Sequence, residues 1–204
     1  MKTKNRIDFS ISIKTKINKS MKNPFYRKTF TIFLLLCTVM VSGVIAQSND
    51  LVVMIDSKYS QKQQVLGNLP LGTAVFEIGT QGNPWQQIRE YMEQNRSTVA
   101  IHLFANASYN ALQLGNTTYA LEEAEQELEL PMLEGLYQGN NIQLLIYDCN
   151  LGSNPEGLSL LKKISERAYF NIAVPTHCNS IFGSNLVFDH TTMNQTTTNS
   201  IFIR

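Results

Sequence analysis

The chain is organised around the stretch Gln143-Leu-Leu-Ile-Tyr-Asp-Cys-Asn150. Leu144, Leu145 and Ile146 form a short apolar run, which is typical of a strand buried on both faces of a parallel sheet. The run ends abruptly in polar residues, and chemistry in open α/β sheets gathers at the carboxyl ends of strands. Cys149 therefore stands where a nucleophile would stand, although a lone cysteine at a strand end is more often buried and inert.

Similar apolar runs recur along the chain, and segments with a helical pattern separate them. Besides the run at Leu144, strands are expected at 51–56, 73–78, 98–104, 170–175 and 184–188. Helical segments are expected over 57–66, from the cap at Asn83-Pro84, over 121–138 with a break at Pro131, and from Asn154-Pro155. Strands that alternate with helices predict an α/β domain with a mainly parallel sheet of about six strands.

Local patterns add three expectations. Trp85, Ile88 and Met92 recur at helical spacing, which predicts that Trp85 packs in the core rather than forming a ligand platform. The segment 111–119 alternates around Gly115 and predicts a small hairpin or flap. The glutamate-rich part of 121–138 is interpreted as a solvated helix face rather than a site for a basic ligand.

The first 46 residues have the pattern of a secretory signal peptide rather than of a folded domain. Residues 1–29 carry nine Lys and Arg against one acid, and residues 30–46 are uncharged and end in Val44-Ile-Ala46. Met21 is an alternative start to Met1, because the segment that follows Met21 makes a normal basic region. The rival interpretation is an uncleaved membrane anchor, and 17 residues are at the short end of the roughly 17–25 that a span needs.

Cleavage after residue 46 leaves an exported domain, 47–190, and a polar tail, 191–204, whose low-complexity part, 191–199, is expected to be mobile. The region 47–204 contains eight of the 17 basic residues and 15 of the 16 acidic residues, so its net charge is −7. An acidic domain is not a typical nucleic-acid binder. The sequence shows neither metal-ligand spacing nor a phosphate-binding glycine loop, so no metal or cofactor is predicted. The expected partner is a protein or a cell surface, with membrane contact only through an uncleaved signal segment.

Several segments resemble one bacterial family, the domain of unknown function 4347. The segments are Ile101–Asn116, Leu144–Asn150, and Gly157 with Leu160 and Leu161. This domain is common at the amino end of very large exported adhesin-like proteins, and it looks like a relative of the caspase and gingipain peptidases. The resemblance covers roughly residues 51–183 and implies a caspase-like three-layer sandwich. It also raises the alternative that the chain is a fragment of a larger adhesin.

The family pattern has Ser-His-Gly after the third strand and Gly-Cys-Asn after the fourth, which by analogy supply a base and a nucleophile. Cys149 and Asn150 match, whereas Asn106, Ala107 and Asp148 stand where the histidine and the two glycines belong. An amide cannot act as a base. Alanine restricts the backbone of an oxyanion donor, and a neighbouring carboxylate raises the pKa of a thiol. The resemblance therefore predicts a site that has lost peptidase activity.

Two residues that follow the fifth strand keep other possibilities open. His177 is a candidate relocated base for Cys149, and Cys178 is a candidate disulfide partner, because two cysteines in an oxidising compartment favour pairing. Such a bond requires Cα atoms within about 7 Å. His102 matches a strand histidine of the family and is expected to be structural, and His190 shows no acid–base partner. The prediction is a non-enzymatic surface or secreted interaction module, with a cysteine peptidase that uses Cys149 and His177 as the alternative.

Overall fold

The computed structural model describes residues 50–136, 141–183, 186–193 and 199–202. The chain divides into two units, and every described residue belongs to the second, Ser48–Arg204. The predicted signal segment, 1–46, lies outside the described residues, and so do its two possible starts. Among the residues described, no helix has the length and apolar character that a membrane span requires.

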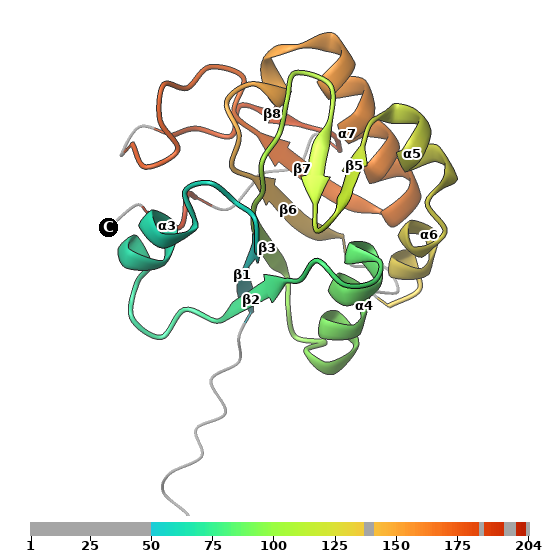
Figure 1. Cartoon of the computed structure of the whole chain (residues 1–204), viewed down its shortest axis with the longest axis horizontal. Helices are drawn as coiled ribbons and strands as arrows, with labels where there is room; N and C mark the ends of the chain where they lie inside the picture. The colour runs from blue at the N-terminus through green and yellow to red at the C-terminus, as the bar shows by residue number, and fades with distance from the viewer. Residues whose placement is uncertain (1–49, 137–140, 184–185, 194–198, 203–204) are drawn as a thin grey trace, which may run out of the picture. The chain divides into compact units, whose positions relative to one another are not determined.

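A six-stranded sheet with the order β2-β1-β3-β6-β7-β8 forms the middle layer of the domain (Figure 1). The strands are β1 (Leu51–Asp56), β2 (Val75–Ile78), β3 (Ala100–Phe104), β6 (Ile142–Ile146), β7 (Phe170–Val174) and β8 (His190–Thr191). All neighbouring pairs are parallel except β7 and β8. These pairings confirm the predicted α/β domain with a mainly parallel sheet of about six strands.

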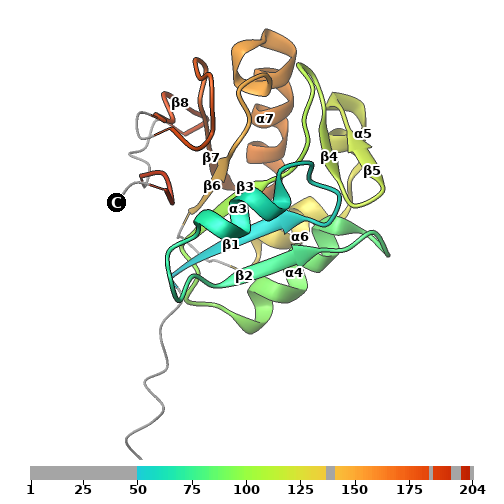
Figure 2. The same ribbon diagram turned by 60° about the vertical axis from the view of Figure 1, so that its left-hand side comes forward.

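Helices and loops cover the two faces of this sheet unequally. The helices are α3 (Lys62–Asn68), α4 (Pro84–Gln94), α5 (Leu121–Gln126), α6 (Glu129–Glu134) and α7 (Pro155–Ala168), with a 3-10 turn η1 (Leu151–Ser153). The predicted hairpin is present as β4 (Leu112–Leu114) and β5 (Thr117–Tyr119). Helices α4 to α7 lie on one side of the sheet, whereas α3 and the chain around β8 lie on the other (Figures 1 and 2). The result is a three-layer α/β sandwich.

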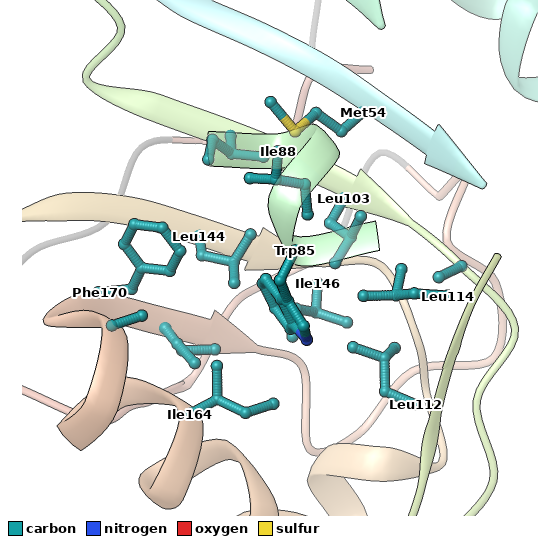
Figure 3. Packing of buried hydrophobic residues seen from close by; sticks show 14 of the residues in the cluster. Met54, Trp85, Ile88, Leu103, Leu112, Leu114, Leu144, Ile146, Ile164 and Phe170 are labelled. Atoms are coloured by element: carbon teal, nitrogen blue, oxygen red, sulfur yellow. The ribbon is translucent and has the colours of Figure 1, made fainter. Parts of the chain in front are cut away.

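The face under α4 to α7, here the helix-covered face, has an almost wholly apolar core. Strand residues such as Met54, Leu103 and Ile146 are fully buried there, together with Trp85 of α4. Figure 3 shows the Trp85 ring among Leu144, Ile146, Leu112 and Leu114, where the sheet meets the hairpin. Trp85 is 0% exposed, so its predicted core position is confirmed.

The opposite face, here the loop-covered face, packs aromatic rings under α3 and irregular segments. Phe104 of β3 stacks on Tyr147 with ring centroids 4.2 Å apart. Phe202 contacts both rings, and Phe188 contacts Tyr147 edge-on. The apolar face therefore needs the last part of the described chain to cover it.

The described part of the segment 121–138 forms two helices, but the break is not at Pro131. It lies at residues 127–128, and Pro131 is the third residue of α6. The first turn of a helix has backbone N–H groups without intrahelical partners, so a proline costs little there. The predicted break position is wrong for this reason.

Two predictions for the end of the chain are also wrong. A sixth strand was predicted at 184–188, of which 184–185 lie outside the described residues. Residues 186–188 are not a strand, and β8 is the sixth strand instead. Within the segment 191–199, which was expected to be mobile, Thr191 pairs with Ala173 of β7, and Thr192 Oγ1 accepts the backbone N–H of Ile172. The expectation is therefore wrong for these two threonines, whereas residues 194–198 lie outside the described residues. Beyond that segment, Phe202 packs against the loop-covered core.

Candidate functional site

The carboxyl ends of the parallel strands lie at one edge of the sheet, where two cavities adjoin Cys149. The first has a volume of about 330 Å³ and is lined by Tyr59, Asn106 and Asp148, among others. The second, of about 510 Å³, is lined by His177 and Cys178. The structure thus brings Asn106 and Cys149 into the walls of one cavity and His177 into the walls of the other.

A disulfide joins Cys149 to Cys178 between these cavities. Cys149 lies three residues after β6 and Cys178 four residues after β7, and these strands are parallel neighbours. Their Cα atoms are 5.3 Å apart, inside the range that a disulfide needs. In this state the Cys149 sulfur carries no proton to lose and is not a nucleophile.

The side chain of Asn106 holds a neighbouring loop through two hydrogen bonds. Its Nδ2 donates to the Lys58 carbonyl at 3.0 Å, and its Oδ1 accepts from the backbone N–H of Ser60 at 3.2 Å. These bonds tie the end of β3 to the loop between β1 and α3. An amide, which is both donor and acceptor, suits this task. Asn106 therefore has a structural role that accounts for its presence without catalysis.

Asp148 also has a local structural role beside Cys149. Its Oδ1 accepts from the backbone N–H groups of Asn150 at 2.8 Å and Leu151 at 2.7 Å, which closes the turn that carries Cys149. Burial raises the pKa of Tyr59 to about 12, and the charge of Asp148 adds to this effect. The carboxylate therefore acts electrostatically on another residue that lines the first cavity.

Ala107 does not occupy a backbone conformation that requires glycine. Within the described ranges, Tyr169 is the only residue other than glycine with a positive φ. Ala107 instead forms an isolated antiparallel bridge with Leu112, the first residue of β4. The loop after β3 is thus drawn towards the hairpin.

His177 belongs to a second polar cluster at the mouth of the larger cavity. Its side chain is 91% exposed, and its Nδ1 lies 2.7 Å from Thr176 Oγ1 and 3.6 Å from Asp189 Oδ2. Thr176 in turn donates its backbone N–H to Asp189 Oδ1 at 2.7 Å. Burial opposes ionisation of Asp189, but hydrogen bonds from Thr176, from its own backbone and from His177 together lower the pKa. This cluster links the end of β7 to the residue that precedes β8.

His102 lies within the loop-covered core and does not line either cavity. Its Nδ1 is 2.8 Å from the Tyr147 hydroxyl, which also accepts the backbone N–H of Ile201 at 2.7 Å. His102 Nδ1 and the Tyr147 hydroxyl share one hydrogen bond, and the imidazole tautomer sets which of them donates. Burial lowers the pKa of His102 to about 4. His190 lies in β8 and pairs with Val174.

A family model described as a domain of unknown function, DUF4347, matches residues 52–193, which span β1 to β8 and the whole site. The chain belongs to this family. No curated protein and no solved structure matches it. The expected family assignment is therefore confirmed, and the match carries no activity with it.

The sequence did not lead us to two features of the DUF4347 site. Tyr147 immediately precedes the Asp-Cys-Asn turn, and its position at the end of a buried strand was the available clue. The contact of Thr176 with Asp189 joins residues from separate segments, and no local pattern announces it. Among the described residues of the domain, no group of three or more His, Cys, Asp or Glu is placed to hold a metal ion.

Proposed function

We propose that this DUF4347 domain is an exported interaction module that binds a protein or cell-surface partner at the cavities beside Cys149 and does not hydrolyse peptides. The observation that carries the proposal is the use of the Asn106 amide. Both of its polar atoms are bonded to the loop at Lys58 and Ser60, in the wall of the cavity that Cys149 also lines. A catalytic cysteine at that place requires a base, and an amide supplies none.

A caspase-like ancestry is part of the same proposal. It is supported by the positions of Asn106 and Cys149, which follow the neighbouring strands β3 and β6 and line one cavity. Export is supported by the signal-peptide pattern and by the disulfide, since such bonds persist in oxidising compartments.

The test measures the thiol of Cys149 in reduced protein. We expect a thiolate-selective probe to react with Cys149 slowly at neutral pH, with an apparent pKa at or above the free-cysteine value of about 8.5. Mass-spectrometric mapping of the labelled peptide separates Cys149 from Cys178. Reduced wild type should show no peptidase turnover above a Cys149→Ala control, because general-base assistance is typically worth about 10²–10⁴ in rate.

A matched gain-of-base variant sharpens this test. The double change Asn106→His and Asp148→Asn adds an imidazole and removes the adjacent charge, while an asparagine at 148 retains an Oδ1 acceptor for the turn. Faster labelling of Cys149 at neutral pH is expected. A wild-type thiolate pKa well below about 8.5 would sink the proposal.

A second candidate function is a cysteine peptidase that is active only when reduced. The observation that favours it is that His177 and Cys149 line the same cavity of about 510 Å³. Its requirement is specific: His177→Ala must abolish both turnover and the fast labelling of Cys149. Unchanged labelling in this variant eliminates the relocated base.

A further inference from the structure

The cavity of about 330 Å³ has a negative charge in its wall that no positively charged lining residue balances. Among the residues that line it, all of them described, Asp148 is the only acid, and none is Lys, Arg or His. Two lysines flank the lining segment 59–61, and both are engaged elsewhere. Lys58 turns its ammonium to Asn116 of the hairpin and lines a different cavity, and Lys62 pairs with Glu77. Cys149 is in the disulfide and carries no charge. The cavity therefore offers one negative charge with no lining cation against it.

Asp148 has one oxygen occupied and one available. Its Oδ1 accepts two backbone N–H groups, those of Asn150 and Leu151, within the turn. Its Oδ2 accepts no hydrogen bond from the described part of the chain. A carboxylate has about four acceptor positions, so about half of its capacity remains unused. The site thus has the charge and the free acceptor that a cationic ligand needs.

We propose that this cavity binds a primary ammonium group, as presented by a lysine side chain of a partner polypeptide. The inference rests on the proposed function and names the chemistry of its partner. An ammonium is a compact charge with three donors that need separate acceptors. In this arrangement Asp148 Oδ2 accepts one N–H of the ammonium. The other two N–H groups can donate to side-chain oxygens in the cavity wall. Such side chains belong to Ser60, Gln61, Asn150, Asn179 and Ser180.

The geometry favours an ammonium over a guanidinium. Arginine binds carboxylates best through two parallel hydrogen bonds, one to each oxygen. Oδ1 of Asp148 is already engaged by two backbone groups, so this bidentate arrangement is blocked. The volume of about 330 Å³ is at the small end of the roughly 300–1,000 Å³ of small-molecule sites. It is suited to a single side chain rather than to a long peptide.

The experiment titrates the oxidised protein with short blocked peptides and follows backbone amide shifts by NMR. The probes are acetyl-Ala-Lys-Ala-amide and the same peptide with Arg or Gln in place of Lys. We expect the lysine peptide to bind at least about tenfold more tightly than either, which is the scale of one hydrogen bond to a charged group. The shifts should map to the loops around Tyr59 and Cys149, and the affinity should fall as salt is raised.

A matched pair of variants isolates the charge. Asp148→Asn keeps an Oδ1 acceptor for the turn and removes the charge, so lysine-peptide affinity should fall about tenfold or more. Glu122→Gln makes the same change in net charge on the exposed side of α5, lines neither cavity and should bind as wild type does. Equal binding of the lysine and arginine peptides, no binding of either, or unchanged affinity in Asp148→Asn overturns the inference.

Two further readouts separate this inference from the proposed function. The unblocked peptide Ala-Ala-Ala-amide offers only an amino terminus. If it matches the lysine peptide and also depends on Asp148, the ammonium chemistry holds and its source is a chain end. Mass spectrometry of the titrated peptides reports cleavage, which refutes the non-peptidase proposal whether or not lysine is preferred.

Discussion

The two faces of the sheet are covered in different ways. On the helix-covered face, α4 to α7 and the hairpin bury aliphatic side chains around Trp85. On the loop-covered face, one short helix and irregular segments cover a cluster of aromatic rings and the buried His102. The disulfide and both cavities adjoin the loops of this second cover.

Because of this difference, we expect the stability of the two faces to respond differently to pH and to reductant. Helices satisfy their own backbone hydrogen bonds, so the cover over Trp85 requires little beyond apolar area. Irregular segments need partners for their backbone groups, and the loop-covered face supplies them from side chains. The N–H of Ile201 donates to the Tyr147 hydroxyl, which is shared with His102. Stability on this face is therefore tied to groups that titrate or oxidise.

The largest expected effect is on the helix-covered face. Trp85→Ala should lower the free energy of unfolding by about 3–5 kcal/mol, because it leaves a large cavity among fully buried residues. The loss should be the same with and without reductant. The loss of stability is measured by urea unfolding followed by circular dichroism, because Trp85 is the only tryptophan and the variant has no tryptophan fluorescence to follow. Leu128→Ala, at a side chain 78% exposed, is the control and should change stability by about 0.5 kcal/mol at most. A loss below about 1 kcal/mol at Trp85 would contradict the described packing.

The next effect is specific to the loop-covered face. Reduction of the disulfide should lower the free energy of unfolding by about 3–4 kcal/mol, since the bond closes a loop of 29 residues in the unfolded chain. Urea unfolding with and without dithiothreitol is the measurement. The double variant Cys149→Ser, Cys178→Ser should start at the lower value and ignore the reductant. Equal stability of wild type in both buffers would show that the bond does not form in the purified protein.

The third effect is a pH dependence carried by His102. Its folded pKa of about 4 is below the unfolded value of 6.5, so the unfolded state binds more protons between these values. Stability from the neutral ring is fully present above about pH 6.5 and is lost as the pH falls towards 4. The loss amounts to about 3 kcal/mol at about 1.4 kcal/mol for each pKa unit.

His102→Gln removes this titration, and its unfolding free energy should fall less than that of wild type between pH 7 and pH 4. His177→Gln is the matched control, because it removes a histidine whose side chain is 91% exposed. It should keep the full loss seen in wild type. Parallel pH profiles of wild type and His102→Gln would mean that His102 is not buried in the neutral form.

The apolar runs were good predictors where strands are buried on both faces. The patterns at 51–56 and 98–104 and around Leu144 all became strands with the expected direction. The prediction of a strand that includes 186–188 is wrong because apolar side chains can be buried without their backbone joining a sheet. Leu186 and Phe188 are buried outside any strand, and the polar pair His190–Thr191 takes the edge position. Burial is a property of side chains, whereas strand pairing depends on which backbone passes the edge.

Three features could be predicted from the amino-acid sequence alone: the α/β class, the helix N-cap at Asn83 and the place of Cys149 after a buried strand. These rest on local periodicity and turn chemistry, which neighbouring residues encode. Two roles follow only from the folded arrangement: Asn106 holds the loop at Lys58, and Asp148, in a cavity wall, has one oxygen that accepts no hydrogen bond from the described residues. Those roles depend on backbone groups brought from distant segments. A backbone N–H or carbonyl has no signature in the sequence, so its partner is known only once the chain has folded.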